Sequence, residues 1–223
     1  MVLFPNAKIN IGLNVTEKRN DGLHNIESIF YPVFELYDVL EIVKCEELKF
    51  TSTGIEIPGS EKDNLCLKAY QLLKQDFNIS PVHIYLLKVI PIGAGLGGGS
   101  ADAAFTLKGL NDLFGLKLTD ERLISYAQKL GSDCAFFIKN KPVYAFNKGD
   151  EFEDIELDLS SYEIKIEYPN IHIGTAEAYA GIKAKAPVKN IKMLISDPIE
   201  NWKVTVKNDF ENSIFPTHPE IKE

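Results

Sequence analysis

Hydrophobic and polar residues alternate at the start of the chain. Residues 7–15 alternate, with isoleucine, leucine or valine at positions 9, 11, 13 and 15 and lysine, asparagine or glycine at positions 8, 10, 12 and 14. A period of two is typical of a strand with one buried and one polar face, so we predict a strand here. A polar turn follows at residues 21–22, and residues 26–44 are predicted to form two further strands, split at Pro32 and at residues 37–38.

The middle of the chain combines extended and helical patterns. Residues 51–60 are predicted to be a strand and a turn. Apolar residues at helical spacing predict a helix over 64–77, with Asp63 as its N-cap. A strand is expected at 82–90, and it leads into a cluster of glycines at 93–99.

Two helices are predicted after the glycine cluster. The first begins at Ser100 or Asp102 and ends near Gly115. The second is capped by Thr119, and Gly131 closes it at a position where a left-handed residue is favoured.

A second part of the chain is predicted to begin near Gly149, which gives two domains at 1–148 and 149–223. Strands and helices alternate here without a regular βαβ rhythm, so the predicted fold class is α+β. The expected strands of this part are 152–158 and 162–168, and its expected helices are 188–196, 198–204 and 206–214.

Composition and charge narrow the classes of protein. The chain has 223 residues, 45% of them hydrophobic and 25% charged, which is ordinary for a folded globular protein. Its formal net charge of −8 argues against nucleic acid as a partner, because a phosphate backbone requires a basic surface. Apolar runs stop well short of the roughly 20 residues of a membrane span, so no membrane partner is expected.

The cysteines indicate the compartment. Three widely spaced cysteines favour neither a disulfide scaffold nor a zinc site, both of which need more cysteines closer together. Reduced thiols and the lack of a secretion signal at the N-terminus predict a cytoplasmic protein.

The glycine cluster is the most informative segment. It holds five glycines in seven residues, between a predicted strand and a predicted helix. The first amides of a helix have no partner within it, and the helix dipole adds positive character, so such a turn can bind a phosphate group.

Three other interpretations of this cluster are weaker. Gly93, Gly95 and Gly98 satisfy the dinucleotide pattern, but the acidic residue at the expected distance, Asp120, begins a helix instead of ending a strand. A Walker loop needs a lysine where Gly99 stands. A flexible linker is not usually enclosed by a strand and an alanine-rich helix.

The motifs themselves resemble a known family. PIGAGLGGGSADAA, residues 91–104, resembles the second motif of the GHMP kinases, and NAKINIGLNV with KRNDGLHNIESIF resembles one branch of them. The resemblance runs from residue 5 to about 215. It implies an N-terminal domain like ribosomal protein S5 domain 2 and a ferredoxin-like C-terminal domain. It also implies ATP-dependent phosphorylation of the 2-hydroxyl of a methylerythritol that carries a cytidine diphosphate group, in non-mevalonate isoprenoid biosynthesis.

Two residues are candidates for catalysis. Asp133 lies within an apolar run, where a carboxylate has to be paired or hydrogen-bonded. Without the resemblance, Asp133 has a competing interpretation as a helix-capping or structural residue, and Lys8 has one as a solvated strand residue. The resemblance implies that Asp133 accepts the proton of the substrate hydroxyl and that Lys8 keeps this carboxylate ionised.

The resemblance also assigns the nucleotide site. ATP with Mg²⁺ is the expected cofactor, and no protein ligand of the metal is assigned. Asn64 has a competing interpretation as a helix-start residue. The expected ATP-binding residues are Asn64, Leu65, Lys88, Pro91, Gly93, Ala94, Gly95, Leu96, Gly97, Gly98, Gly99 and Ser100.

The implied partner is a small molecule with a cytidine diphosphate group. The loop Arg19–His24 is expected to hold the cytosine, with His24 hydrogen-bonded to it and Tyr179 as an aromatic partner. Leu23 stands where the family has an aromatic residue, and Asn10 shares the polar strand face with the candidate lysine. A monomer or weak homodimer is expected.

Two alternatives stay open. Another small alcohol, as in mevalonate or homoserine kinases, is the first, and a non-catalytic protein that grips RNA is the second. The net charge of −8 and the presence of Lys8 with Asp133 argue against the second. The family's third, glycine- and serine-rich motif is not found after residue 100, so the sequence is expected to be truncated within its second domain.

Overall fold

The structure is a computed structural model that describes residues 1–171 and 173–222. The chain divides into two compact units, one of residues 1–9 and 32–141 and the other of residues 10–31 and 142–223. Helices occur with two four-stranded sheets of antiparallel and mixed strands, so the predicted α+β class is confirmed. No helix in these described ranges is long and apolar enough to cross a membrane.

The first unit contains a four-stranded sheet. Its strands lie in the order β1 (Val2–Leu3), β4 (Val39–Lys44), β6 (Val82–Lys88) and β5 (Lys49–Gly54). Only β5 and β6 run parallel, and the other neighbours are antiparallel. The predicted strands at 51–60 and 82–90 correspond to β5 and β6, although β5 begins earlier and ends at Gly54.

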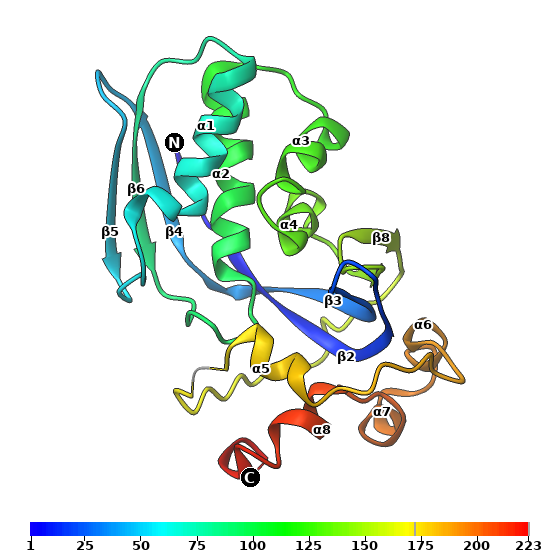
Figure 1. The fold of residues 1–223 in the computed structure, drawn as a ribbon. Helices are drawn as coiled ribbons and strands as arrows, with labels where there is room; N and C mark the ends of the chain where they lie inside the picture. The colour runs from blue at the N-terminus through cyan, green and yellow to red at the C-terminus, as the bar shows by residue number, and fades with distance from the viewer. Residues whose placement is uncertain (172, 223) are drawn as a thin grey trace. The chain divides into compact units, whose positions relative to one another are not determined.

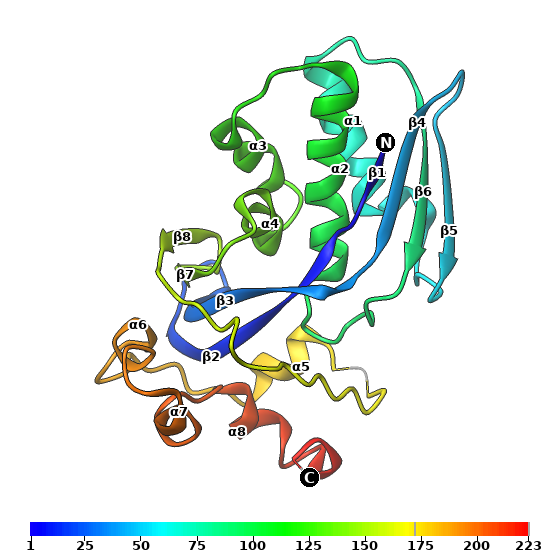
Figure 2. The ribbon, with the colours of Figure 1, turned by 180° about the vertical axis from the view of Figure 1, so that it is seen from behind.

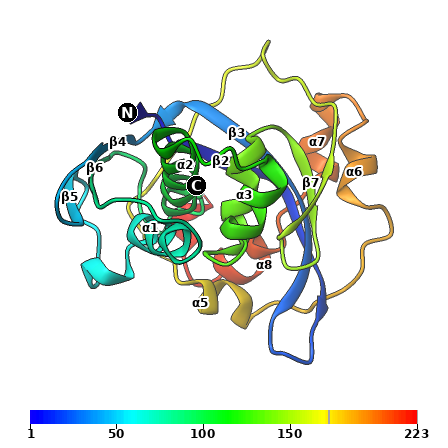
Figure 3. The same ribbon diagram turned by 90° about the horizontal axis from the view of Figure 1, so that it is seen from above.

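Two helices, α1 (Leu65–Asp76) and α2 (Gly98–Phe114), lie side by side against one face of this sheet (Figures 1 and 3). The predicted N-cap of α1 was wrong by one residue. Asp63 ends a short 3-10 helix, and Asn64 caps α1 by accepting the N–H of Cys66 at 2.8 Å. The carboxamide can do this because its own backbone is extended, as the capping position requires.

Helix α2 begins earlier than predicted. Its first residue is Gly98 and its N-cap is Gly97, at φ +71°, so neither Ser100 nor Asp102 opens it. A glycine in the left-handed conformation turns the chain into the helix without a side-chain cap. The predicted end of α2 is confirmed, because Gly115 follows it at φ +61°.

The segment after α2 is partly as predicted. Thr119 caps α3 (Asp120–Ala127) by accepting the N–H of Arg122, as expected. Gly131 does not close this helix in a left-handed conformation, since α3 ends at Ala127 and Gly131 is extended at φ 173°. A short 3-10 helix, Ser132–Ala135, and α4 (Phe136–Lys139) follow, and both pack against α2 and α3.

The second sheet has the order β2 (Asn6–Lys18), β3 (His24–Tyr37), β7 (Val143–Phe146) and β8 (Glu151–Asp154). The predicted break at Pro32 was wrong, because β3 continues through it. Its pairing with β7 covers only Ser28 to Phe30, so the missing N–H of Pro32 removes no hydrogen bond from that ladder. The predicted break before β4 is confirmed at Asp38.

The second unit also contains α5 (Thr175–Ala180), α6 (Ile191–Leu194), α7 (Ile199–Thr205) and α8 (Phe210–Ile214). Helices α5 and α8 lie next to each other (Figure 2). Leu13, Val15 and Ile26 form a buried cluster against which Tyr179 and Phe210 pack.

The two strands predicted in this part of the chain are only partly found. The predicted strand at 152–158 ends at residue 154, and residues 162–168 form no strand. Tyr162 and Ile164 are exposed, so their alternation has no partner sheet to face.

Candidate active site

The glycine loop has an alternating backbone conformation. Gly93, Gly95 and Gly97 have φ of +74°, +73° and +71°, which residues with a side chain rarely adopt. The loop leads directly into the first turn of α2, whose amides have no partner within the helix. The helix dipole makes this end positive without any basic side chain. The segment therefore has the backbone geometry of an anion site.

Some of these positions must be glycine because a side chain would clash with the rest of the protein. At others the protein leaves room for a side chain. An added Cβ at Gly97 would lie 2.9 Å from the Phe137 ring and 3.0 Å from Lys8 Cγ. An added Cβ at Gly99 would meet no atom within 4 Å, and no positive φ is found there. Gly97 is therefore fixed by packing, whereas the space above Gly99 is open to a ligand.

Lys8 and Asp133 form an ion pair beside this loop. Lys8 Nζ lies 3.2 Å from Asp133 Oδ2, and their side chains are 6% and 30% exposed. The backbone N–H of Lys8 donates to the carbonyl of Leu96 at 2.9 Å, which ties β2 to the loop. The structure thus brings together the two residues that the family resemblance pairs.

The strand that carries Lys8 is buried on both faces at this point. Lys8 is buried, as is Ala7 on the other face, so the competing interpretation of Lys8 as a solvated strand residue was wrong. A buried ammonium has to be paired, and the Asp133 carboxylate meets that requirement. Asp133 is held in place because the two phenylalanines that follow it are buried in the core of the first unit.

Cys134 lies directly after the candidate base. Burial raises the pKa of this thiol to about 11; a hydrogen bond with Ser100 lowers it by less than burial raises it, and the negative charge of Asp133 adds a smaller increase. The thiol is therefore protonated at neutral pH and does not compete with Asp133 as a base or nucleophile.

Lys88 is buried below the loop instead of facing it. Its ammonium donates to Asp38 Oδ2 at 2.5 Å and to Asp102 Oδ2 at 2.8 Å, and its side chain is 3% exposed. Burial raises the pKa of Asp102 to about 7, Lys88 opposes that increase, and Asp38 adds to it. The sequence analysis missed Asp38 and Asp102, although both are acids in apolar surroundings, the same signal that singled out Asp133.

The residues expected to hold the cytosine lie together in the second unit. The rings of His24 and Tyr179 stack with centroids 4.6 Å apart and planes at 15°, and Phe210 packs edge-on against Tyr179 at 5.0 Å. Leu23 is 52% exposed in the preceding turn, and Asn10 donates to Ser28 Oγ at 2.8 Å. The stack leaves no room for a third ring between His24 and Tyr179, but it forms an aromatic platform.

Comparison with known proteins identifies the class. Residues 64–141 match the GHMP kinases N terminal domain. A phosphomevalonate kinase from Streptococcus pneumoniae, 13% identical, shares the fold with a TM-score of 0.50 over 66% of this chain and 48% of that one. The fold, the glycine loop and this match define the protein as a GHMP kinase, an ATP-dependent kinase with the predicted architecture.

More similar proteins narrow the family. The 4-diphosphocytidyl-2-C-methyl-D-erythritol kinase of Bacteroides fragilis is 50% identical over all of this chain and 82% of its own length. That of Cytophaga hutchinsonii is 51% identical with the same coverage. A crystal structure of a 4-(cytidine 5'-diphospho)-2C-methyl-D-erythritol kinase is 26% identical, with a TM-score of 0.77 over 100% of this chain and 80% of that one. The chain belongs to the 4-diphosphocytidyl-2-C-methyl-D-erythritol kinase family.

Proposed function

We propose that this chain transfers the γ-phosphoryl group of ATP to the 2-hydroxyl of 4-diphosphocytidyl-2-C-methyl-D-erythritol, with Asp133 as base. The observation that carries the proposal is the Lys8–Asp133 ion pair, at 3.2 Å, directly beside the glycine loop. The Lys8 N–H to Leu96 bond fixes that proximity through the backbone. The names of the relatives supply the identity of the alcohol.

In the reaction, the 2-hydroxyl oxygen forms a bond to the γ-phosphorus as the bond from that phosphorus to the β,γ-bridging oxygen breaks. ADP leaves with the electron pair, and the hydroxyl proton passes to the Asp133 carboxylate. Lys8 pairs with this carboxylate and polarises the hydroxyl. Alignment and charge neutralisation supply much of the acceleration in phosphoryl transfer.

The loop residues are proposed to hold the phosphates. Backbone amides at the start of α2 face the position for an anion, and the open space above Gly99 lets phosphate oxygens approach the backbone. Mg²⁺ enters with the nucleotide and supplies charge neutralisation when bound. The described residues contain no group of three or more His, Cys, Asp or Glu that could hold a metal ion, and no protein ligand of Mg²⁺ is assigned.

The cytosine is proposed to bind at the platform formed by His24 and Tyr179. Both rings come from the residues expected to recognise it, although they are far apart along the chain. The cytosine can stack on the outer face of the His24 ring, and a ring nitrogen of His24 can hydrogen-bond to it. We propose a cytoplasmic enzyme whose partner is this small molecule.

The proposal is tested by measuring ADP release from ATP with a panel of alcohols. The cytidine-diphosphate-linked methylerythritol is expected to be turned over, whereas mevalonate and homoserine are not. Turnover of mevalonate or homoserine in preference to the linked alcohol would move the chain to another branch of GHMP kinases.

Replacing Gly99 with alanine separates protein packing from ligand binding. The new methyl group meets no atom of the protein, and alanine in a helix is favoured over glycine by up to about 1 kcal/mol, so the free energy of unfolding is expected to stay equal or rise slightly. The methyl group occupies the proposed phosphate space, so the Kd for ATP is expected to rise about tenfold or more, equivalent to about 1.4 kcal/mol.

Urea unfolding and ATP titration by calorimetry measure the two effects. Gly174→Ala is the matched control, since its added Cβ also meets nothing within 4 Å. An unchanged Kd for ATP in Gly99→Ala would contradict the proposed phosphate position.

Replacing Leu23 with phenylalanine restores an aromatic residue next to the platform. Leu23 is exposed, so the larger side chain fits without repacking the core. We expect KM for the cytidine-linked alcohol to fall by about twofold to tenfold, equivalent to the 0.5–1.5 kcal/mol of an aromatic pair, with kcat unchanged. Leu23→Met is the control of similar size. Steady-state kinetics in which both variants match the parent would show that residue 23 does not stack on the base.

A further inference from the structure

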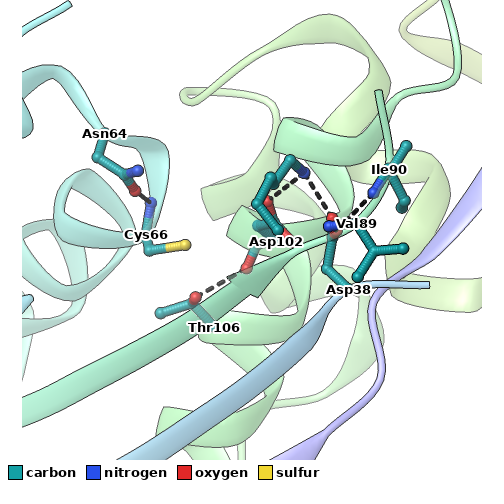
Figure 4. A network of polar contacts seen from close by, with 8 residues as sticks. Asp38, Asn64, Cys66, Val89, Ile90, Asp102 and Thr106 are labelled. Atoms are coloured by element: carbon teal, nitrogen blue, oxygen red, sulfur yellow. Dashed lines mark hydrogen bonds and ion pairs between the residues drawn. The ribbon is translucent and has the colours of Figure 1, made fainter. Parts of the chain in front are cut away.

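The buried ion cluster below the glycine loop has no part in the reaction described above. It consists of Lys88, Asp38 and Asp102, which we call the loop clamp. Lys88 Nζ lies 2.5 Å from Asp38 Oδ2 and 2.8 Å from Asp102 Oδ2. Figure 4 shows the side chains of Asp38 and Asp102 close to each other. Three buried charges are costly to desolvate, so their retention needs a physical reason.

The clamp fixes the entrance to the loop. Asp38 Oδ1 accepts the backbone N–H groups of Val89 at 2.6 Å and Ile90 at 2.8 Å, the two residues that follow β6 (Figure 4). Asp38 lies at the junction of β3 and β4 and is completely buried. Its carboxylate therefore anchors the last residues before the loop to a fixed point of the sheet.

The clamp also fixes the exit from the loop. Asp102 belongs to the second turn of α2 and accepts from the same ammonium that Asp38 holds. That ammonium lies under the first turn as well, because an added Cβ at Gly98 would be 2.8 Å from Lys88 Nζ. One charged atom thus holds both ends of residues 91–97.

We infer that Lys88, Asp38 and Asp102 are positioning residues that preset the glycine loop for ATP, and that Lys88 acts through the loop without touching the nucleotide. This inference rests on the proposed use of the loop as the phosphate site. Preset amides lose less conformational freedom when the phosphates bind, which raises affinity. The geometry explains why a lysine in this place is buried by two acids instead of facing a ligand.

The orphaned oxygen of Asp102 supports a geometric role. Asp102 Oδ1 is buried and has no hydrogen-bond partner in the described part of the chain, so this carboxyl is not optimised for stability. Burial also raises the pKa of this carboxyl. Of the charges that face it, Lys88 opposes the increase and Asp38 adds to it. Thr106, one turn later, donates to the backbone carbonyl of Asp102 and has no hydrogen bond to the ammonium among those described.

The test compares three variants with nucleotide alone. Asp102→Ala removes the helix end of the clamp and leaves Lys88 with Asp38, so the Kd for ATP is expected to rise about tenfold. Asp102→Asn, whose amide oxygen still accepts from Lys88, is expected to stay within about threefold of the parent. Thr106→Val is the matched control for a lost hydrogen bond on the same helix face, and its Kd is expected to be unchanged.

Hydrogen exchange of the nucleotide-free chain gives an independent readout. Faster exchange of the amides of residues 89–100 in Asp102→Ala, but not in Thr106→Val, is expected. If Asp102→Ala does not fold, the same measurement is made on Lys88→Gln, and faster exchange is again expected. If Lys88 only contacted ATP, its replacement would leave exchange in the nucleotide-free chain unchanged.

The outcomes distinguish the inference from the proposed function. An unchanged or tighter Kd for ATP in Asp102→Ala would overturn the clamp, because it would mean that the released lysine is neutral or binds phosphate directly. Unchanged exchange at residues 89–100 would overturn it as well. Failure of the parent chain to bind ATP at all would instead count against the proposed function.

Discussion

Replacing Asp133 with alanine is expected to lower kcat by about 10²- to 10⁴-fold, the usual contribution of a general base. The KM for ATP is expected to change by less than about threefold, because Asp133 acts on the hydroxyl and only its partner Lys8 contacts the loop backbone. A loss confined to kcat is the signature of an interaction made in the transition state. Steady-state kinetics with both substrates varied measures the two constants.

Two further variants sharpen this test. Asp133→Asn keeps the shape of the side chain but removes its capacity as a base, so its kcat is expected to resemble that of Asp133→Ala. Ser132→Ala changes the exposed neighbour in the same 3-10 helix and is expected to keep the parent kcat. Near-normal turnover by a folded Asp133→Asn would remove Asp133 from the role of base.

Methylerythritol 4-phosphate lacks the cytidine. We expect its kcat/KM to be at least about 10³-fold lower than that of the cytidine-linked alcohol. A site that hydrogen-bonds and stacks on a group discriminates by several orders of magnitude against analogues without it. The physical basis here is the platform of His24 and Tyr179, which loses its ligand when the base is absent. Rates of ADP release at matched concentrations give the ratio.

A variant separates stacking from hydrogen bonding at this platform. His24→Phe can keep the ring packed against Tyr179 but has no ring nitrogen, so it is expected to lose part of the selectivity while the protein stays folded. His24→Ala removes both contributions and is expected to lose more. If the parent enzyme has the same kcat/KM for the cytidine-linked alcohol and for methylerythritol 4-phosphate, the platform is excluded as the cytosine site.

Local signals in the sequence predicted much of this fold. Alternation predicted β2. Thr119 predicted the start of α3 and Gly115 the end of α2, because a helix cap is determined by a few neighbouring residues. The glycine loop, too, is a local pattern. The family resemblance then brought Lys8 and Asp133 forward, and the structure places them in contact.

The errors occurred where tertiary packing decided the outcome. Gly131 was expected to close a helix, but the chain there turns extended into the segment that carries Asp133. The loop clamp was missed because Asp38, Lys88 and Asp102 come from three separate elements, and no periodicity links them. Pro32 was expected to break a strand, yet its effect depends on which neighbour its nitrogen would have faced.

The contacts at the N-terminus also bear on synthesis of the protein. Asn6 and Asn140 exchange side-chain hydrogen bonds across 134 positions. At about 5 to 20 residues per second, a ribosome takes roughly 7 to 27 s to cover that distance. During this interval β2 and its neighbour β3 have been made, but Asp133 and Asn140, the partners of Lys8 and Asn6, have not. The polar side chains at the start of β2 therefore reach their partners only late in translation, and until then a chaperone can protect them.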